Sequence, residues 1–290
     1  MAKNRAQIVY SPAQKTVRAL LWLLLACFAV IVVFPVLYII IGSFKENQEL
    51  LLGGSDIFPK KWIIQNYIDA WNQANFAVYT KNSLLLSFGV MILSLIISSM
   101  AGYVFSRKTF FGKELIYGIF TAFMFINVGS VSLRPLYELA TKMKINTSLW
   151  PVILFSAGGG QATYIFLCRG YVNSVPRELD EAAKIDGCSF FQTYYKVIIP
   201  MLKPVMATIA ILSFRQGWNE YIMPRVFTMT NDSLRPLTVG VNMLKNAGDG
   251  AAAWNIMFAG ATLAVIPILV VFICFSRYFM GGLTSGAVKG

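Results

Sequence analysis

Long hydrophobic stretches recur along the chain and alternate with segments that concentrate the charged residues. An α-helix rises about 1.5 Å per residue, so crossing about 30 Å of hydrocarbon takes about 20 apolar residues. Six stretches approach or exceed this length, namely 19–44, 84–106, 115–133, 147–168, 204–224 and 254–276. The pattern predicts an all-α, polytopic membrane protein with six transmembrane helices.

Composition agrees with a chain that lies in lipid. Of its 290 residues, 57% are hydrophobic and only 13% are charged, whereas soluble domains carry about 25% charged residues. Histidine is absent, which removes the commonest general base and metal ligand. A net charge of +12 can indicate nucleic-acid binding in a soluble protein, but cations gather in the cytoplasmic loops of membrane proteins. We therefore expect no nucleic-acid partner, no catalytic residue and no metal or cofactor bound by this chain.

The distribution of positive charge predicts the orientation. With the N-terminus inside, the cytoplasmic segments hold fourteen Lys and Arg residues and the outer segments hold ten. This excess predicts that both termini are cytoplasmic. The chain then divides into an N-terminus (1–18), one permease domain (19–276) and a C-terminal tail (277–290). Within the domain, 45–82 is an outer loop and 173–203 is a cytoplasmic loop.

The loop at 173–203 predicts two short helices joined by a sharp bend. Pro176 suits the first turn of a helix, and acidic residues follow it near the positive end of the macrodipole. Gly187 is expected to end this helix in the left-handed conformation. Ser189 and Gln192 have the spacing of a capping box that begins a second helix. Pro200 is expected to end that second helix.

The same loop carries a motif. Glu181-Ala182-Ala183, followed by Gly187 and Pro200, resembles the EAA motif of the membrane subunits of binding-protein-dependent ABC importers. Two conservative departures from the family pattern stand at Val197 and Ile199. The resemblance implies that the helix pair is a coupling element that docks into a cleft of an ATP-hydrolysing subunit. The same five residues would then make or shape that contact.

Two further stretches resemble the carbohydrate branch of that family, typified by the smaller membrane subunit of the maltose transporter. They are Trp218-Asn219-Glu220 with Pro224, and the C-terminal 282–290. The resemblance implies a second contact with the ATPase pair, made by Gly286, Ala287, Val288, Lys289 and Gly290. It also implies a type I importer transmembrane domain in the bacterial inner or plasma membrane, forming half of a heterodimeric pathway. The implied partners are a second permease subunit, an ATPase dimer that holds ATP and Mg, and an extracytoplasmic binding protein that delivers an oligosaccharide.

Polar residues inside the predicted spans are candidates for the substrate pathway, because polar groups at membrane depth usually face a cavity or a partner. Arg215, Trp218 and Asn219 have the spacing of one helical face in the fifth span. A ring beside an amide and a guanidinium suits a sugar, and arginine also favours an acidic one. Asn127 and Arg134 form a second polar stripe in the third span. The alternative is that these groups only hold the helices together.

Two other functions stay open. The same machinery can carry a solute that is not a sugar, and a secondary transporter can draw on an ion gradient instead of ATP. A secondary transporter normally places acidic residues deep in the bundle, where only Glu220 qualifies. The C-terminal glycines do not form a phosphate-binding loop, because Ala287 stands where that loop needs lysine. ATP is therefore expected in a partner subunit.

Overall fold

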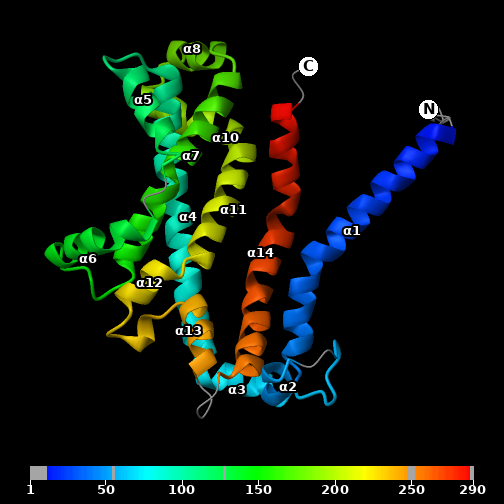
Figure 1. Ribbon diagram of the computed structural model, residues 1–290. Coiled ribbons are helices and arrows are strands. Elements are labelled where there is room, and N and C mark those ends of the chain that lie inside the picture. Colours follow the sequence, from blue (N-terminus) through cyan, green and yellow to red (C-terminus); the bar gives the residue numbers. More distant parts are fainter. Residues whose placement is uncertain (1–11, 54–55, 127–128, 247–251, 288–290) are drawn as a thin grey trace.

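The computed structural model describes residues 12–53, 56–126, 129–246 and 252–287. Within these ranges the regular elements are all helical, and no β-strand is present. Figure 1 shows several long helices lying side by side, with short helices gathered at the two ends of the bundle. The predicted all-α class is confirmed.

In the described part of the chain, four helices are long and apolar enough to cross a membrane, by length and composition. They are α1 (Pro12–Gly42), α4 (Phe76–Arg107), α7 (Trp150–Ser174) and α14 (Trp254–Ala287). A fifth candidate is a bent pair, in which Phe190–Met201 meets α11 (Lys203–Asn219) at 80°. α1, α4, α7 and α14 overlap the first, second, fourth and sixth predicted spans. The bent pair overlaps the fifth.

The third predicted span, 115–133, is not a single helix in the described residues. α5 (Lys113–Ala122) ends early, and the 3-10 turn η1 (Gly129–Ser132) leads into α6 (Leu133–Lys142), which points away from the bundle (Figure 1). Gly129 has a φ of 53°, a left-handed conformation that a continuous α-helix excludes. Six uninterrupted spans are therefore not observed, because hydropathy measures apolar content and not the continuity of the backbone.

Short elements complete the two ends of the bundle. One end carries α8 (Glu178–Ile185), α9 (Phe190–Thr193), the π-helical η2 (Tyr194–Ile198) and α10 (Ile199–Met201). The other end carries α2 (Asn47–Leu51), α3 (Gln65–Gln73), α12 (Ile222–Phe227), η3 (Asp232–Leu234), α13 (Leu237–Met243) and η4 (Leu244–Asn246). The first residues of α1 and the last residues of α14 lie toward the α8 end of the molecule (Figure 1). The cytoplasmic location of both termini stays a prediction.

Helix α4 is the centre of the bundle and packs along α7 and α11. Two glycines allow this close approach. A Cβ on Gly102 of α4 would lie 2.7 Å from the Cβ of Cys168 in α7, and one on Gly217 of α11 would lie 2.8 Å from the Cα of Ser87 in α4. Small residues at helix contacts are the usual solution in lipid, where dispersion and hydrogen bonds rather than water exclusion hold helices together.

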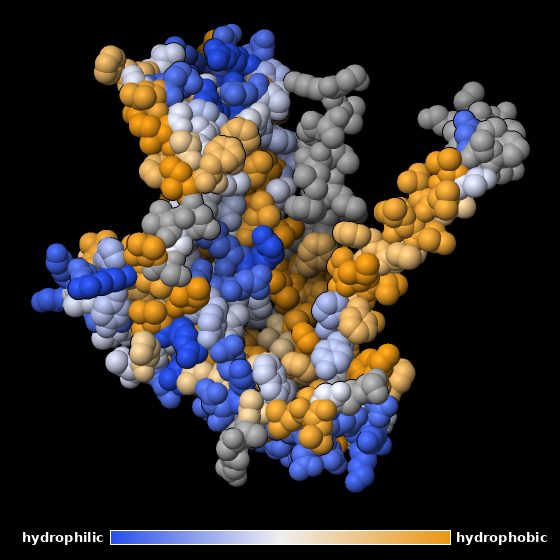
Figure 2. Space-filling model, viewed as in Figure 1, coloured by the Kyte–Doolittle hydropathy of each residue, from blue (hydrophilic) through white to orange (hydrophobic). Residues whose placement is uncertain are grey.

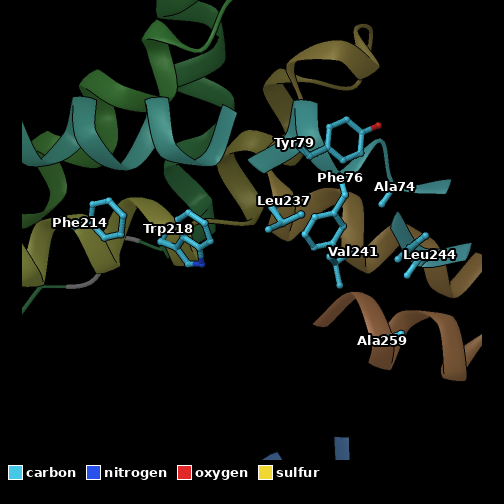
Figure 3. Packing of buried hydrophobic residues seen from close by; sticks show 10 residues of the cluster. Ala74, Phe76, Tyr79, Phe214, Trp218, Leu237, Val241, Leu244 and Ala259 are labelled. Atoms are coloured by element: carbon cyan, nitrogen blue, oxygen red, sulfur yellow. The ribbon is translucent and has the colours of Figure 1, made fainter. Parts of the chain in front are cut away.

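A second core joins the bundle to its far end, opposite α8. Phe76 and Tyr79 of α4 pack with Leu237 and Val241 of α13, near α14 (Figure 3). The Asn82 side chain donates hydrogen bonds to two loop carbonyls, those of Ser233 (2.7 Å) and Arg235 (3.0 Å). These contacts fix the far end to α4, so the bundle and its end caps form one packed body.

Helix α1 is hydrophobic along most of its length and leans away from its neighbours (Figures 1 and 2). Every residue of α1 from Thr16 to Tyr38 is exposed, and burial begins only at the end of the helix, at Gly42. A helix with this surface requires lipid or another apolar chain around it. Its exposure agrees with a membrane-embedded subunit.

Candidate functional site

The helix pair α8–α9 is the candidate site at the α8 end, and Gly187 makes the bend between its members. Gly187 has a φ of 78°, which is left-handed. Its N–H donates to the carbonyl of Lys184 at 3.1 Å, and the N–H of Cys188 donates to the carbonyl of Ala183 at 2.9 Å. This pair of hydrogen bonds closes α8 as a Schellman motif. The predicted left-handed cap at Gly187 is confirmed.

The start of α9 also matches its prediction. The backbone N–H of Ser189 donates to Oε1 of Gln192 at 2.7 Å, and the backbone N–H of Gln192 donates to Oγ of Ser189 at 3.3 Å. These two hydrogen bonds form a capping box. Because a cap ends one helix and a second cap begins the next within three residues, the angle between α8 and α9 is fixed on both sides.

The second helix ends within one residue of the predicted position at Pro200. The helical path runs through Pro200 to Met201 and bends by 80° before α11. Proline lacks an N–H and its ring clashes with the carbonyl four residues earlier. The wider π-helical turn Tyr194–Ile198 immediately precedes this position and gives the ring room. The helix therefore accommodates Pro200 in its last turn and ends one residue later.

The helix pair is attached to the end of α4 by a buried ion pair. The carboxylate of Asp180 accepts hydrogen bonds from Tyr103 Oη at 2.9 Å and from Arg107 Nε at 2.8 Å. Arg107 also donates to the carbonyl of Val175 at 2.7 Å, and its side chain is only 7% exposed. The ring of Phe190 in α9 stacks on Tyr103, with centroids 4.7 Å apart. Tyr103 and Arg107, at the end of α4, thus contact α8, and Tyr103 also contacts α9.

This anchor gives a stability prediction. Asp180→Ala is expected to lower the free energy of unfolding by about 1–3 kcal/mol, because the buried Arg107 loses its charged partner. Thermal unfolding of the detergent-purified subunit measures the change. Glu178→Ala is the matched control, since Glu178 lies two residues earlier on the same helix with an exposed side chain, and surface changes of this kind stay within about 0.5 kcal/mol. Equal losses in the two variants would contradict the anchoring role of Asp180.

The structure divides the residues of the EAA motif between two faces of α8. Ala183 is buried at 5% exposure, whereas Glu181 and Ala182 are exposed. Ile185 follows Ala182 by three residues and is 87% exposed. Ile185 therefore extends the exposed face of α8 that carries Glu181 and Ala182. Sequence reasoning missed Ile185 and the Asp180–Arg107 pair. An isoleucine in an otherwise polar short helix was a usable signal for the first, but only tertiary structure reveals the second.

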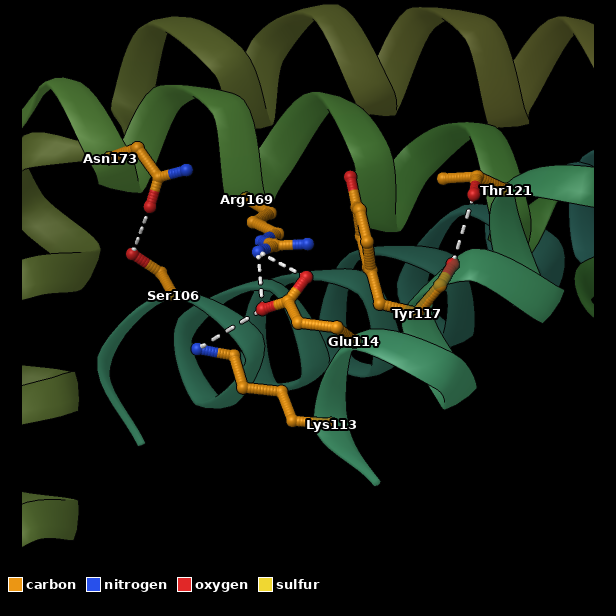
Figure 4. Close-up of polar contacts among 7 residues, drawn as sticks. All are labelled: Ser106, Lys113, Glu114, Tyr117, Thr121, Arg169 and Asn173. Carbon is orange, nitrogen blue, oxygen red and sulfur yellow. Dashed lines mark hydrogen bonds and ion pairs between the residues drawn. The ribbon is translucent and has the colours of Figure 1, made fainter. Parts of the chain in front are cut away.

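A polar cluster joins α5 to α7 close to the helix pair (Figure 4). Arg169 of α7 donates to both carboxylate oxygens of Glu114 in α5, at 3.1 and 3.2 Å. Its guanidinium also lies 3.7 Å from the ring centroid of Tyr117. Ser106 at the end of α4 donates to Asn173 of α7 at 2.6 Å. Helices α4, α5 and α7 therefore meet at the same end of the molecule as α8.

The predicted face in the fifth span is only partly observed. Trp218 is buried at 4% exposure and stacks on Phe214 with centroids 6.0 Å apart, whereas Arg215 and Asn219 are exposed. Figure 2 shows hydrophilic surface over α11 at mid-height, and Figure 3 shows the indole in the core. At about 100° per residue, Trp218 and Asn219 lie about 60° and 40° to opposite sides of Arg215. The boundary between core and surface therefore falls between Trp218 and Arg215. The ring of Trp218 is not exposed for a sugar to contact.

The remaining predicted residues are only partly described. Arg134 lies on α6 rather than in a span, is exposed, and forms an i,i+4 ion pair with Glu138 at 3.1 Å. Gly286 and Ala287 are the last residues of α14, which continues past residue 276. Asn127 and Val288, Lys289 and Gly290 lie outside the described residues. In the described part of the chain, no group of three His, Cys, Asp or Glu residues is placed to hold a metal ion.

Comparison with known proteins agrees with this geometry. The family described as the binding-protein-dependent transport system inner membrane component matches residues 94–284. Among curated relatives, the arabinooligosaccharides transport system permease protein AraQ of Halalkalibacterium halodurans is 32% identical over 284 residues, covering 96% of this chain and 99% of the relative. The galactooligosaccharides transport system permease protein GanQ of Bacillus subtilis is 33% identical over 272 residues, covering 93% and 94%.

A solved structure shows the same fold. In the crystal structure of a bacterial ABC transporter involved in the import of the acidic polysaccharide alginate, one chain matches with a TM-score of 0.79 and 21% identity. The match covers 93% of this chain and 99% of the other. With the family match over most of the chain, it follows that this protein belongs to the binding-protein-dependent transport system inner membrane components, as a membrane-embedded permease and not a catalytic subunit.

Proposed function

We propose that this chain is one of two permease subunits of an ATP-driven ABC importer that carries an oligosaccharide. The α8–α9 pair with its bend at Gly187 carries this proposal, because it is a projecting, doubly capped element anchored to the central helix. Relatives named for arabinooligosaccharides and galactooligosaccharides support a sugar as the substrate.

In this account α8 and both termini face the cytoplasm, where an ATPase dimer holds ATP and Mg. The outward face of α8, with Glu181, Ala182 and Ile185, enters a cleft of the ATPase. Movement of that subunit displaces α8, and the Asp180–Arg107 pair passes the displacement to α4. A transport cycle needs such a lever, because nucleotide energy biases the inward- and outward-facing states only through contacts that differ between them.

The other partners occupy other surfaces. A second permease subunit completes the pathway. An extracytoplasmic binding protein docks at the end that carries α13 and delivers the sugar. The C-terminal residues, Gly286 to Gly290, contact the ATPase pair, as the resemblance to sugar permeases implies. Gly187 and Pro200 shape the coupling element without touching the ATPase themselves.

Reconstituted transport tests this function. The complex purified with its companion subunits is placed in proteoliposomes, and uptake of labelled arabinotriose and galactotriose is followed in the presence of the binding protein. ATP inside the vesicles is expected to drive uptake, and a proton or sodium gradient is not. Uptake driven by an ion gradient without the ATPase subunit would contradict the proposal. ATP-driven uptake of amino acids or peptides, with none of sugars, would contradict the substrate class.

A further inference from the structure

A cavity of about 570 Å³ lies beside α7, between the α5–α6 segment on one side and α12 on the other. Ligand sites usually occupy roughly 300–1,000 Å³ and combine apolar walls with a few polar groups. None of the described residues that the sequence marked for the substrate pathway lines this cavity. The lining residues of the cavity determine which ligand it can bind.

Two polar side chains of the cavity lining have no partner in the described structure. Gln161 of α7 is 6% exposed, and neither its Nε2 nor its Oε1 forms a hydrogen bond. Glu220 lines the cavity next to the end of α11, and its carboxylate forms no ion pair or hydrogen bond with a described residue. A buried unpaired amide costs about 1–3 kcal/mol. Such a group in a native structure calls for an explanation, and inside a cavity a water molecule or a ligand hydroxyl can supply the missing partner.

The rest of the cavity wall consists of aromatic rings and of glycine backbone. Phe120, Phe123 and Phe155 contribute rings, and Gly158 and Gly159 contribute backbone without side chains. A Cβ built on Gly158 meets no atom within 4 Å, so its absence is not required by packing within the chain. A lipid tail would cover the rings but leave the amide and the carboxylate unpaired. A sugar ring satisfies both kinds of wall, because its C–H faces lie against aromatic rings and its hydroxyls hydrogen-bond to amides and carboxylates.

We propose that this cavity is a substrate-contact site of the permease, in which Gln161 and Glu220 hydrogen-bond the hydroxyls of a neutral sugar ring lying against the phenylalanine wall. The proposal rests on the proposed function and adds a charge preference to it. Glu220 places a negative group where the ring passes, and a like charge on the ligand opposes binding there. Uronic oligosaccharides are therefore disfavoured, in contrast to what the exposed Arg215 suggested from sequence.

Filling the cavity is the first test. Gly158→Leu in the reconstituted complex is expected to reduce uptake of arabinotriose or galactotriose, whichever the wild type carries faster, at least tenfold. Assembly and the stimulation of ATP hydrolysis by the loaded binding protein should persist, because the new side chain has free space. Gly170→Leu is the matched control, being another open glycine on α7 about 18 Å along the helix and outside the cavity. It is expected to stay within twofold of the wild type. Wild-type uptake in Gly158→Leu would overturn the proposal.

Charge selection is the second test, and it decides the matter if Gly158→Leu does not assemble. Uptake of the neutral trisaccharide is compared with that of a trisaccharide of mannuronic acid. Glu220→Gln, which keeps size and removes charge, is expected to shift the neutral-to-acidic uptake ratio at least fivefold toward the acidic sugar. An unchanged ratio, or wild-type preference for the acidic sugar, would overturn the site assignment while leaving ATP-driven sugar import intact. Absence of any ATP-driven sugar uptake by the wild type would instead refute the proposed function itself.

Discussion

Replacing Gly187 with valine is expected to reduce ATP-driven uptake at least tenfold while the complex still assembles. Gly187 has a φ of 78°, where a β-branched residue is strained by its own backbone. No atom lies within 4 Å of the Cβ position, so no collision adds to this strain. The bend can relax only by changing the angle between α8 and α9. The α8–α9 pair would then meet the ATPase at the wrong angle. Uptake is measured alongside co-purification of the ATPase.

Asparagine at the same position separates backbone conformation from side-chain size. Asparagine adopts the left-handed region more readily than other non-glycine residues, and the space around Gly187 accommodates it. Gly187→Asn is therefore expected to retain most of the uptake that Gly187→Val loses. If both variants transport normally, Gly187 has no part in coupling. If both fail equally, the side chain itself, and not the bend, disturbs the contact.

Gly217→Leu is expected to prevent recovery of the folded subunit. A Cβ here would lie 2.8 Å from the Cα and 3.3 Å from the N of Ser87, and these backbone atoms cannot rotate away. Helix α11 would have to separate from α4, the central helix of the bundle. Overpacking by even a few atoms typically costs about 1–3 kcal/mol, and a leucine adds more than that. The expected result is loss of the monodisperse peak when detergent-solubilised membranes are analysed by size-exclusion chromatography.

The control for this variant is Gly118→Leu. Gly118 lies in α5, and a Cβ there meets nothing within 4 Å. The added side chain is apolar, so it also suits a position that faces lipid. Gly118→Leu is expected to give the same peak as the wild type. A normal peak from Gly217→Leu would show that the close approach of α11 to α4 is not needed for folding.

Most of the fold could be predicted from hydropathy because lipid imposes a simple requirement on helix length. The four predicted spans that overlap α1, α4, α7 and α14 meet this length requirement. The third span failed because its apolar content hides a left-handed glycine at 129, which breaks the helix. The fifth predicted span, 204–224, is shorter in the structure, because α11 ends at Asn219 and the separate helix α12 begins at Ile222. The 80° bend lies before this span, between Met201 and Lys203.

The local geometry of the helix pair could also be predicted, because caps depend on residues close in sequence. Gly187, Ser189 and Gln192 behave as their spacing indicated. The residues of the cavity could not be predicted in the same way. Gln161 lies on α7, whereas Glu220 follows the end of α11. The sequence singled out Glu220 as an acidic residue in a span, but nothing local places it beside Gln161. Trp218 shows the opposite error, since a helical face assigned by spacing alone does not reveal where the core begins.

The most direct test of the central claim is a photo-cross-link from the tip of α8. Benzoylphenylalanine is introduced in place of Ile185, whose side chain is 87% exposed and projects beside Ala182. Illumination of the complex in its native membrane is followed by identification of the partner and by comparison of yields with and without ATP. The account predicts a product with the ATPase subunit whose yield changes with nucleotide. A product formed with the extracytoplasmic binding protein instead would place α8 on the wrong side and contradict the account.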